Sequence, residues 1–133
     1  MGFIRNAGRT QGALIMADYD FKMPWPPSVN AWKTPFRNRM ILSKRGREYR
    51  TQALATLEEL GLSGEGIEKP VSVSITLNPP TLRRYDIDNF CKSLFDALTL
   101  GGFWLDDEQI HHLIIKKGEK VKGGGIDVTV NLI

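Results

Sequence analysis

The segment Val71–Leu77 constrains the fold more strongly than any other part of this 133-residue chain. Apolar and polar residues alternate there without a break, which is typical of a β-strand, and Asn78-Pro79-Pro80 ends the pattern. The run Ile126–Leu132 alternates in the same way, and Tyr19–Met23 and Ile110–Ile115 also have the composition of strands. The sequence therefore predicts a β-sheet, within a chain whose length suits one domain.

Two helices are predicted between these strands. The first runs from a cap at Ser43 to about Leu60, and the second starts near Asp88 and ends near Leu100. A Lys- and Gly-rich hairpin loop is expected to join the last two strands. Because helices and strands intermingle without a regular crossover, we expect an α+β fold. It would be a single two-layer domain in which a mixed β-sheet packs with two main helices.

The N-terminal residues are expected to lie outside this domain. We expect residues 1–17 to be a disordered extension and residues 18–133 to form the domain; an older start at Met16 is an alternative. Polar residues and glycines interrupt any apolar targeting segment, and no run approaches the roughly 20 apolar residues of a membrane helix. The single cysteine, Cys91, excludes an internal disulfide framework and a multi-cysteine zinc site. These features predict a cytoplasmic, intracellular protein without a membrane partner.

Acidic residues gather at two places in the second half of the chain. Asp86 and Asp88 precede the second predicted helix, and in an extended segment both carboxylates could reach one Mg²⁺ ion. Lys92, one turn beyond Asp88, could neutralise charge on a phosphoryl group. A purely structural alternative is that Asp88 caps the helix and forms an i,i+4 ladder with Lys92 and Asp96. The second place, Asp106-Asp107-Glu108, fits either a solvated turn or a cation site.

Basic residues give the chain a formal net charge of +3, which permits a polyanionic partner. They cluster at the start of the first predicted helix, directly before Asp86, and in the loop before the last strand. A phosphate docked at the helix N-terminus would offset the unfavourable effect of cations on the helix dipole, although a solvated basic surface fits equally. The basic residues of these clusters that could contact phosphate are Arg45, Arg47, Arg50, Arg83, Arg84, Lys116, Lys117, Lys120 and Lys122, and Arg37, Arg39 and Lys44 extend the first cluster.

Several motifs occur in an order that resembles one known family. They are Pro24–Ser28, the basic stretch Ser43–Arg50, Asp86–Asn89, Lys92, Phe95–Leu98 and Gly102–Asp107. Together they resemble the RusA family of Holliday junction resolvases, over a region from about Tyr19 to the C-terminus.

The resemblance implies a homodimeric, Mg²⁺-dependent endodeoxyribonuclease, with Mn²⁺ as a plausible substitute. It would resolve four-way (Holliday) DNA junctions by paired symmetric nicks during DNA recombination and repair. The acidic residues of the family fall on Asp86, Asp88 and Asp107, and its lysine falls on Lys92. Asp106 is the alternative for the third carboxylate.

The chain departs from the family pattern at one position. Tyr85 stands where the family often has an arginine, so phosphate contact would shift to Arg83 and Arg84. Two other functions remain open at this point. One is a non-catalytic module that binds branched DNA, and the other is a nuclease that prefers flaps, forks or RNA.

Overall fold

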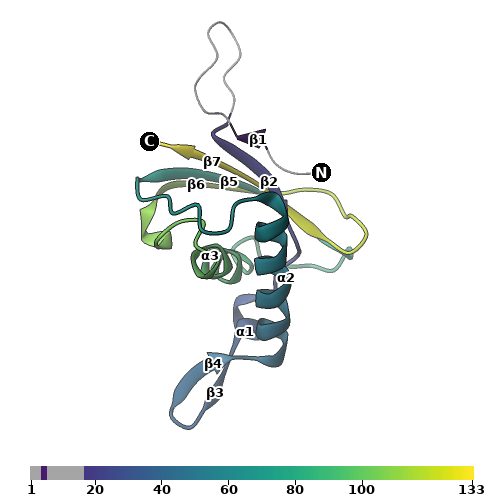
Figure 1. The fold of residues 1–133 in the computed structure, drawn as a ribbon. Coiled ribbons are helices and arrows are strands. Elements are labelled where there is room, and N and C mark those ends of the chain that lie inside the picture. The colour runs from purple at the N-terminus through teal and green to yellow at the C-terminus, as the bar shows by residue number, and fades with distance from the viewer. Residues whose placement is uncertain (1–3, 6–16) are drawn as a thin grey trace, which may run out of the picture.

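The computed structural model describes residues 4–5 and 17–133. Five of the described strands form one sheet in the order β1-β2-β7-β5-β6, and helices α2 (Lys44–Leu60) and α3 (Cys91–Leu100) cover one face of it (Figure 1). The strands are β1 (Ile4–Arg5), β2 (Tyr19–Met23), β5 (Val71–Asn78), β6 (Ile110–Lys117) and β7 (Gly125–Leu132). Strands β5 and β6 are parallel, whereas the other neighbours are antiparallel. The expected α+β domain with a mixed sheet is confirmed.

The predicted strand over residues 71–77 is the centre of this sheet. Val71, Val73, Ile75 and Leu77 are fully buried, while the polar residues between them are half-buried on the opposite face. This difference arises because successive side chains of a strand point to opposite faces, and only one face is covered by helices.

Helix α2 (Lys44–Leu60) agrees closely with the prediction. The Ser43 hydroxyl accepts a hydrogen bond from the Gly46 N–H (2.8 Å), which satisfies a free donor of the first turn. At the other end Gly61 adopts a left-handed conformation, with φ 73°, that ends the helix.

Helix α3 (Cys91–Leu100) begins later than the sequence indicates. Residues 87–90 form a turn, and Phe90 rather than Asp88 occupies the N-cap position. The backbone of this turn already has other partners, because the Asn89 carbonyl accepts the Val29 N–H (2.7 Å) and the Asn89 N–H donates to the Asp86 carbonyl (3.2 Å). The prediction that Asp88 caps the helix is therefore wrong.

The last two strands do not form a hairpin, contrary to expectation. Strand β5 lies between β6 and β7, so the loop of residues 118–124 passes over the end of β5. Two backbone hydrogen bonds hold the loop there, from Gly118 to the Leu77 carbonyl (2.7 Å) and from Val121 to the Pro79 carbonyl (3.0 Å). The strand order β7-β5-β6 places the apolar β5 in the interior of the sheet, where both of its edges are paired.

Residues 29–42 contain structure that the sequence did not indicate. Helix α1 (Val29–Trp32) leads into a hairpin of β3 (Lys33–Phe36) and β4 (Arg39–Leu42), which projects away from the sheet (Figure 1). Arg37 and Asn38 form the turn with positive φ angles of 49° and 65°. The strands are short and mostly exposed, so no alternating apolar pattern marks them in the sequence.

At the N-terminus, residues 4–5 pair with β2, where Ile4 is opposite Asp20. The rest of the expected extension, residues 1–3 and 6–16, lies outside the described residues, and its disorder stays a prediction. Among the helices of the described residues, none has the length and apolar character needed to cross a membrane.

Candidate active site

Asp86 and Asp88 lie on the segment that leads into α3, and both are exposed. Within the described part of the chain, neither carboxylate forms a hydrogen bond or an ion pair. The negative charge of Asp88 nevertheless acts on Cys91: burial, assisted by this charge, raises the pKa of the Cys91 thiol. Both carboxylates are therefore free to contact a ligand.

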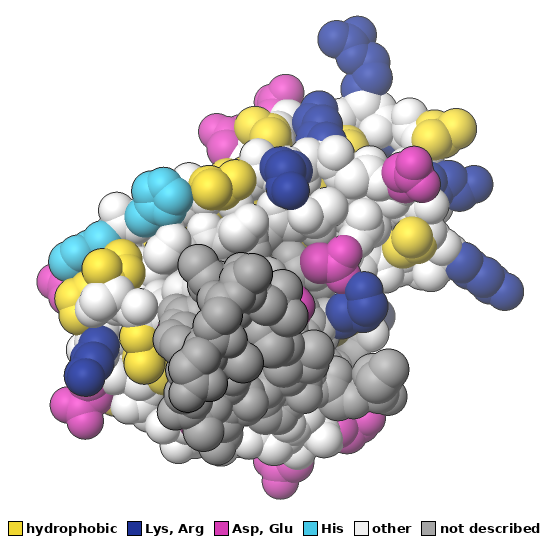
Figure 2. Space-filling view, turned by 90° about the horizontal axis from the view of Figure 1, so that it is seen from above, with side chains coloured by type: hydrophobic (Ala, Val, Ile, Leu, Met, Phe, Trp, Pro, Cys, Tyr) yellow, Lys and Arg dark blue, Asp and Glu magenta, His cyan; other side chains and the backbone are white. Residues whose placement is uncertain are grey.

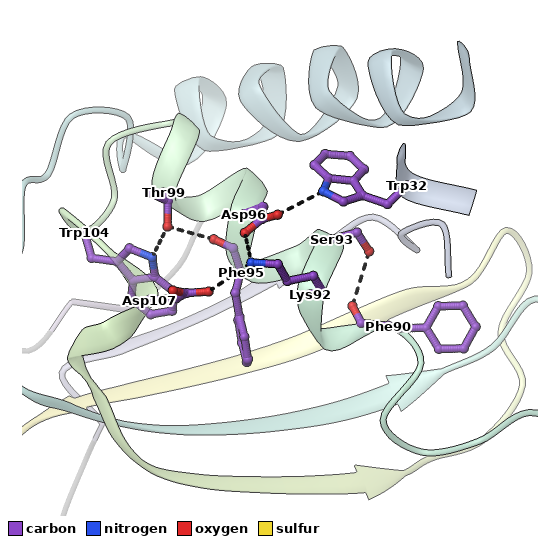
Figure 3. Close-up of polar contacts among 9 residues, drawn as sticks. All are labelled: Trp32, Phe90, Lys92, Ser93, Phe95, Asp96, Thr99, Trp104 and Asp107. Carbon is purple, nitrogen blue, oxygen red and sulfur yellow. Dashed lines mark hydrogen bonds and ion pairs between the residues drawn. The ribbon is translucent and has the colours of Figure 1, made fainter. Parts of the chain in front are cut away.

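Lys92 lies in the first turn of α3 between two carboxylates (Figure 3). Its Nζ is 2.9 Å from Asp96 Oδ1 and 3.9 Å from Asp107 Oδ2. The hydrogen bond to Asp96 raises the pKa of the Lys92 ammonium, and burial opposes this effect only in part. The i,i+4 ladder is therefore formed toward Asp96, whereas the structure over residues 17–133 has no ion pair between Lys92 and Asp88.

Asp107 begins a short 3-10 helix, η1 (Asp107–Gln109), whose shape depends on buried Gln109. The Gln109 Oε1 accepts hydrogen bonds from the N–H groups of Leu105 and Asp106, each at 2.9 Å. Burial raises the pKa of the Asp107 carboxyl, a hydrogen bond with Asp106 raises it further, and Lys92 opposes both. A cation near Asp107 would reduce the repulsion between these acidic side chains.

Asp96 also contacts Lys92, although the sequence predicted it only as part of a helical ladder. Its Oδ2 accepts a hydrogen bond from Trp32 Nε1 (2.9 Å), while Oδ1 accepts from Lys92 (Figure 3). Trp32 is only 2% exposed and immediately precedes β3. One carboxylate therefore connects the candidate lysine to the base of the projecting hairpin.

Lys92, Asp96 and Asp107 line a common cleft between α2, α3 and the hairpin base. The cleft also brings in Arg50 from α2, which is far away in the sequence. Its lining residues are Trp32, Lys33, Leu42, Arg50, Lys92, Asp96, Thr99, Leu100, Asp106 and Asp107. A phosphate in this cleft could therefore contact three cationic side chains, those of Lys33, Arg50 and Lys92, beside the carboxylates.

A second group of cations lies beside Asp86. Arg45, Arg83 and Arg84 line one groove, and Arg84, Asp86 and Lys117 line a neighbouring groove. Since Tyr85 and Arg84 line both grooves, the two adjoin.

Tyr85 also holds Lys117 in place. The Lys117 Nζ donates to the Tyr85 carbonyl (2.7 Å) and lies 4.4 Å from the centre of its ring. The residue that departs from the family pattern thus orients a neighbouring cation.

The remaining predicted DNA-binding residues are dispersed. Arg47 donates to the Leu42 carbonyl (2.9 Å), and Lys120 and Lys122 are exposed in the loop of residues 118–124. Lys116 pairs with Thr76, on the face of the sheet without helices. Figure 2 shows that Lys and Arg on this face are interspersed with Asp and Glu, rather than forming a continuous basic surface.

The three predicted metal ligands suit Mg²⁺ by chemical type but are not gathered into a preformed cluster. Within the described ranges, no group of three or more His, Cys, Asp or Glu is placed to hold one ion. Asp86 and Asp88 lie just before α3 in the sequence. Asp107 is distant in the sequence but contacts Lys92, which lies in the first turn of α3. Mg²⁺ often takes one or two carboxylates and completes its coordination with water and substrate phosphate, so the donor set fits.

An α+β domain with arginine-lined grooves, free carboxylates and a lysine–carboxylate cleft has the chemistry of a protein that binds phosphodiesters and can promote phosphoryl transfer. The comparisons with known proteins specify the family. A family model described as Endodeoxyribonuclease RusA matches residues 24–131, and the chain belongs to this family. The resemblance inferred from the sequence is confirmed.

Curated relatives extend this match over most of the chain. Crossover junction endodeoxyribonucleases RusA from Shigella sonnei (strain Ss046) and Escherichia coli (strain K12) are each 37% identical over 115 residues. A protein of the same name from Enterobacteria phage 82 has the same identity over the same length. In each case the match covers 86% of this chain and 95% of the relative.

Proposed function

We propose that this protein is a structure-specific endodeoxyribonuclease that resolves four-way DNA junctions by paired symmetric nicks, in DNA recombination and repair. The observation that carries the proposal is the contact between Lys92 and Asp107 at the start of α3, the helix that follows the segment bearing Asp86 and Asp88. Membership of the RusA family and relatives named crossover junction endodeoxyribonucleases support the choice of substrate.

Asp86, Asp88 and Asp107 would hold a divalent cation, with Mg²⁺ as the physiological ion and Mn²⁺ as a substitute. When bound, the ion would stabilise negative charge on the phosphoryl oxygens. Carboxylate oxygens are the ligands that such hard cations prefer, and Asp86 and Asp88 have no competing partner among the described residues. Burial is the main cause of the raised pKa of Asp107, and a bound cation would offset both this effect and the smaller repulsion from Asp106 and Asp96.

The cationic side chains would bind and orient the DNA. Lys92 remains protonated because Asp96 accepts its hydrogen bond, so its ammonium can contact a non-bridging oxygen of the scissile phosphate. Arg50, in the same cleft, would bind a nearby phosphate. Arg45, Arg83 and Arg84 would bind the backbone beside Asp86, with little dependence on sequence.

The protein would act as a homodimer inside the cell. A four-way junction has approximate two-fold symmetry, and a C₂ dimer presents two identical sites to opposing strands. Light scattering in solution should then give twice the chain mass of 15.0 kDa. A monomeric mass throughout the active concentration range would contradict this part of the proposal.

The carboxylates provide the direct test of this function. Asp86→Asn, Asp88→Asn and Asp107→Asn each keep the side-chain size but remove a charge, so each should slow cleavage of a synthetic four-way junction in Mg²⁺ by roughly 10²–10⁴-fold. In EDTA the same variants should bind the junction at least as tightly as the parent, since fewer negative charges then face the DNA.

Asp20→Asn is the matched control, because Asp20 is exposed on β2, away from the candidate site. If Asp106→Asn abolishes cleavage while Asp107→Asn does not, the third carboxylate is Asp106. Normal cleavage by all three primary variants would overturn the catalytic assignment, and binding without any nicking by the parent would identify a non-catalytic branched-DNA module.

A further inference from the structure

The β3–β4 hairpin contributes little to the hydrophobic core. All four residues of β3 and the first two of β4 are exposed, including Phe36 (46%) and Met40 (58%). The hairpin projects from the body and pairs only within itself among the described strands (Figure 1). Large apolar side chains on such a projection do not contribute to the core, and exposed apolar surface of this kind is typical of a binding site.

The charge of this segment is entirely positive. No Asp or Glu occurs between Pro24 and Arg47, and the hairpin carries Lys33, Arg37 and Arg39. The Arg37 guanidinium lies 5.2 Å from the centre of the Phe36 ring, so a cation and an aromatic face are presented together. This combination suits nucleic acid, whose phosphates attract the cations and whose unpaired bases stack on aromatic rings.

The base of the hairpin is held firmly although its tip is exposed. The Ser43 N–H donates to the Trp32 carbonyl (3.1 Å), and the Ser43 hydroxyl donates to the Ala31 carbonyl (2.6 Å). Trp32 is also bonded to Asp96, which contacts Lys92. DNA held by the hairpin would therefore lie in a defined position relative to Lys92.

The two ends of the hairpin have different neighbours. Lys33 and Leu42 are directly opposite each other and line the cleft that contains Lys92 and Asp107. Phe36 pairs with Arg39 at the far end of the ladder, next to the turn. A DNA strand that contacts Arg37 and Arg39 near the tip can thus follow the hairpin to Lys33, at the edge of the cleft.

We infer that the β3–β4 hairpin is a DNA-binding arm, in which Arg37 and Arg39 bind backbone phosphates and Phe36 stacks on a base unpaired at the branch point. The inference rests on the proposed function for its choice of branched DNA. The arm contributes affinity and position, and it supplies no group to the phosphoryl transfer itself.

Binding experiments in EDTA test the arm without any cleavage. The double variant Arg37→Ala/Arg39→Ala should reduce the slope of log affinity against log salt by about two, for both a four-way junction and a linear duplex of equal length. Lys69→Ala, which removes an exposed cation two residues before β5, should leave the slope unchanged.

Phe36→Ala should have a different signature. It should weaken junction binding by roughly 10-fold or more, with an unchanged salt slope and little effect on duplex binding. A 2-aminopurine at the branch point should be quenched by the parent and by the control Ile133→Ala, but not by Phe36→Ala. Thermal unfolding should be unchanged in all variants, because the substituted side chains are exposed.

The outcomes separate this inference from the proposed function. Unchanged affinity, salt slope and quenching in the hairpin variants would overturn the arm, whether or not the protein cuts junctions. If the parent shows no preference for junctions over duplexes, the proposed substrate fails, while a reduced salt slope on duplex DNA would still establish the phosphate contacts of the arm. If Arg37→Ala/Arg39→Ala lowers the salt slope but Phe36→Ala quenches 2-aminopurine as the parent does, the stacking role of Phe36 is overturned.

Discussion

Lys92 is held by two carboxylates at unequal distances, and this difference separates its structural role from its chemical one. Its short contact, 2.9 Å to Asp96, is an i,i+4 pair on a lysine side chain that is 54% exposed. Such exposed pairs contribute at most a few tenths of a kcal/mol to stability. The longer contact, 3.9 Å to Asp107, leaves the ammonium able to turn toward a phosphate.

Lys92→Ala should therefore reduce activity much more than stability. We expect junction cleavage in Mg²⁺ to slow by roughly 10²–10³-fold, while the free energy of unfolding in urea changes by less than about 0.5 kcal/mol. Asp96→Asn keeps an acceptor for the Trp32 N–H but removes the charge beside Lys92, so its cleavage rate should fall less. Parallel losses of rate and stability in Lys92→Ala would return Lys92 to a purely structural role.

At the scale of elements, the start of α2 and the end of α1 pack unusually closely. A Cβ atom on Gly46 would lie 2.3 Å from the Trp32 carbonyl oxygen and 3.2 Å from Ser43 Oγ. The same carbonyl accepts the Ser43 N–H, and the same hydroxyl caps α2. Glycine is therefore needed here for close approach of two backbones, although it weakens an isolated helix.

Gly46→Ala tests which of these two effects is larger. Helix propensity alone would stabilise the protein by about 1 kcal/mol. Because the contacted atom is backbone rather than a flexible side chain, we expect the clash to dominate and the unfolding free energy to fall by roughly 1–3 kcal/mol in denaturant titrations. Gln52→Ala, at an exposed position of the same helix, should be neutral or slightly stabilising. A stabilised Gly46→Ala protein would show that the helix ends can separate at little cost.

At the scale of the whole molecule, the cations are divided between grooves, hairpin and loop. The helix-covered side of the sheet carries the arginine-lined groove and the Lys92 cleft, whereas the opposite side carries mixed charges (Figure 2). Lys116 and Lys117 are adjacent in sequence but point to opposite faces of the sheet. DNA bound at the candidate site would therefore contact Lys117 more readily than Lys116.

Replacing Lys116, Lys117, Lys120 and Lys122 together with alanine should lower the salt dependence of junction binding. Each phosphate that no longer meets a lysine should reduce the slope of log affinity against log salt by roughly one. Lys116→Ala alone should account for the smallest part, because its side chain lies on the face without helices. Lys69→Ala again serves as the reference, and an unchanged slope in the quadruple variant would show that the loop only promotes solubility.

The sequence alone determined the features that depend on neighbours along the chain. Alternation identified β2 and β5, while Ser43 and the helical spacing after it located α2. The order of acidic, basic and aromatic motifs was sufficient to recognise the family that the comparisons show. These signals are legible because strand periodicity, caps and short motifs are set by residues only a few positions apart.

Only the tertiary structure decided which distant segments meet. The insertion of β5 between β6 and β7 depends on the pairing of both its edges, which its own alternation does not specify. The contact of Trp32 with Asp96, and the position of Arg50 beside Lys92, depend on how α1 and α2 pack against α3. The hairpin also escaped prediction, because its exposed strands lack the apolar pattern that burial imposes, and its place is fixed by packing at its base.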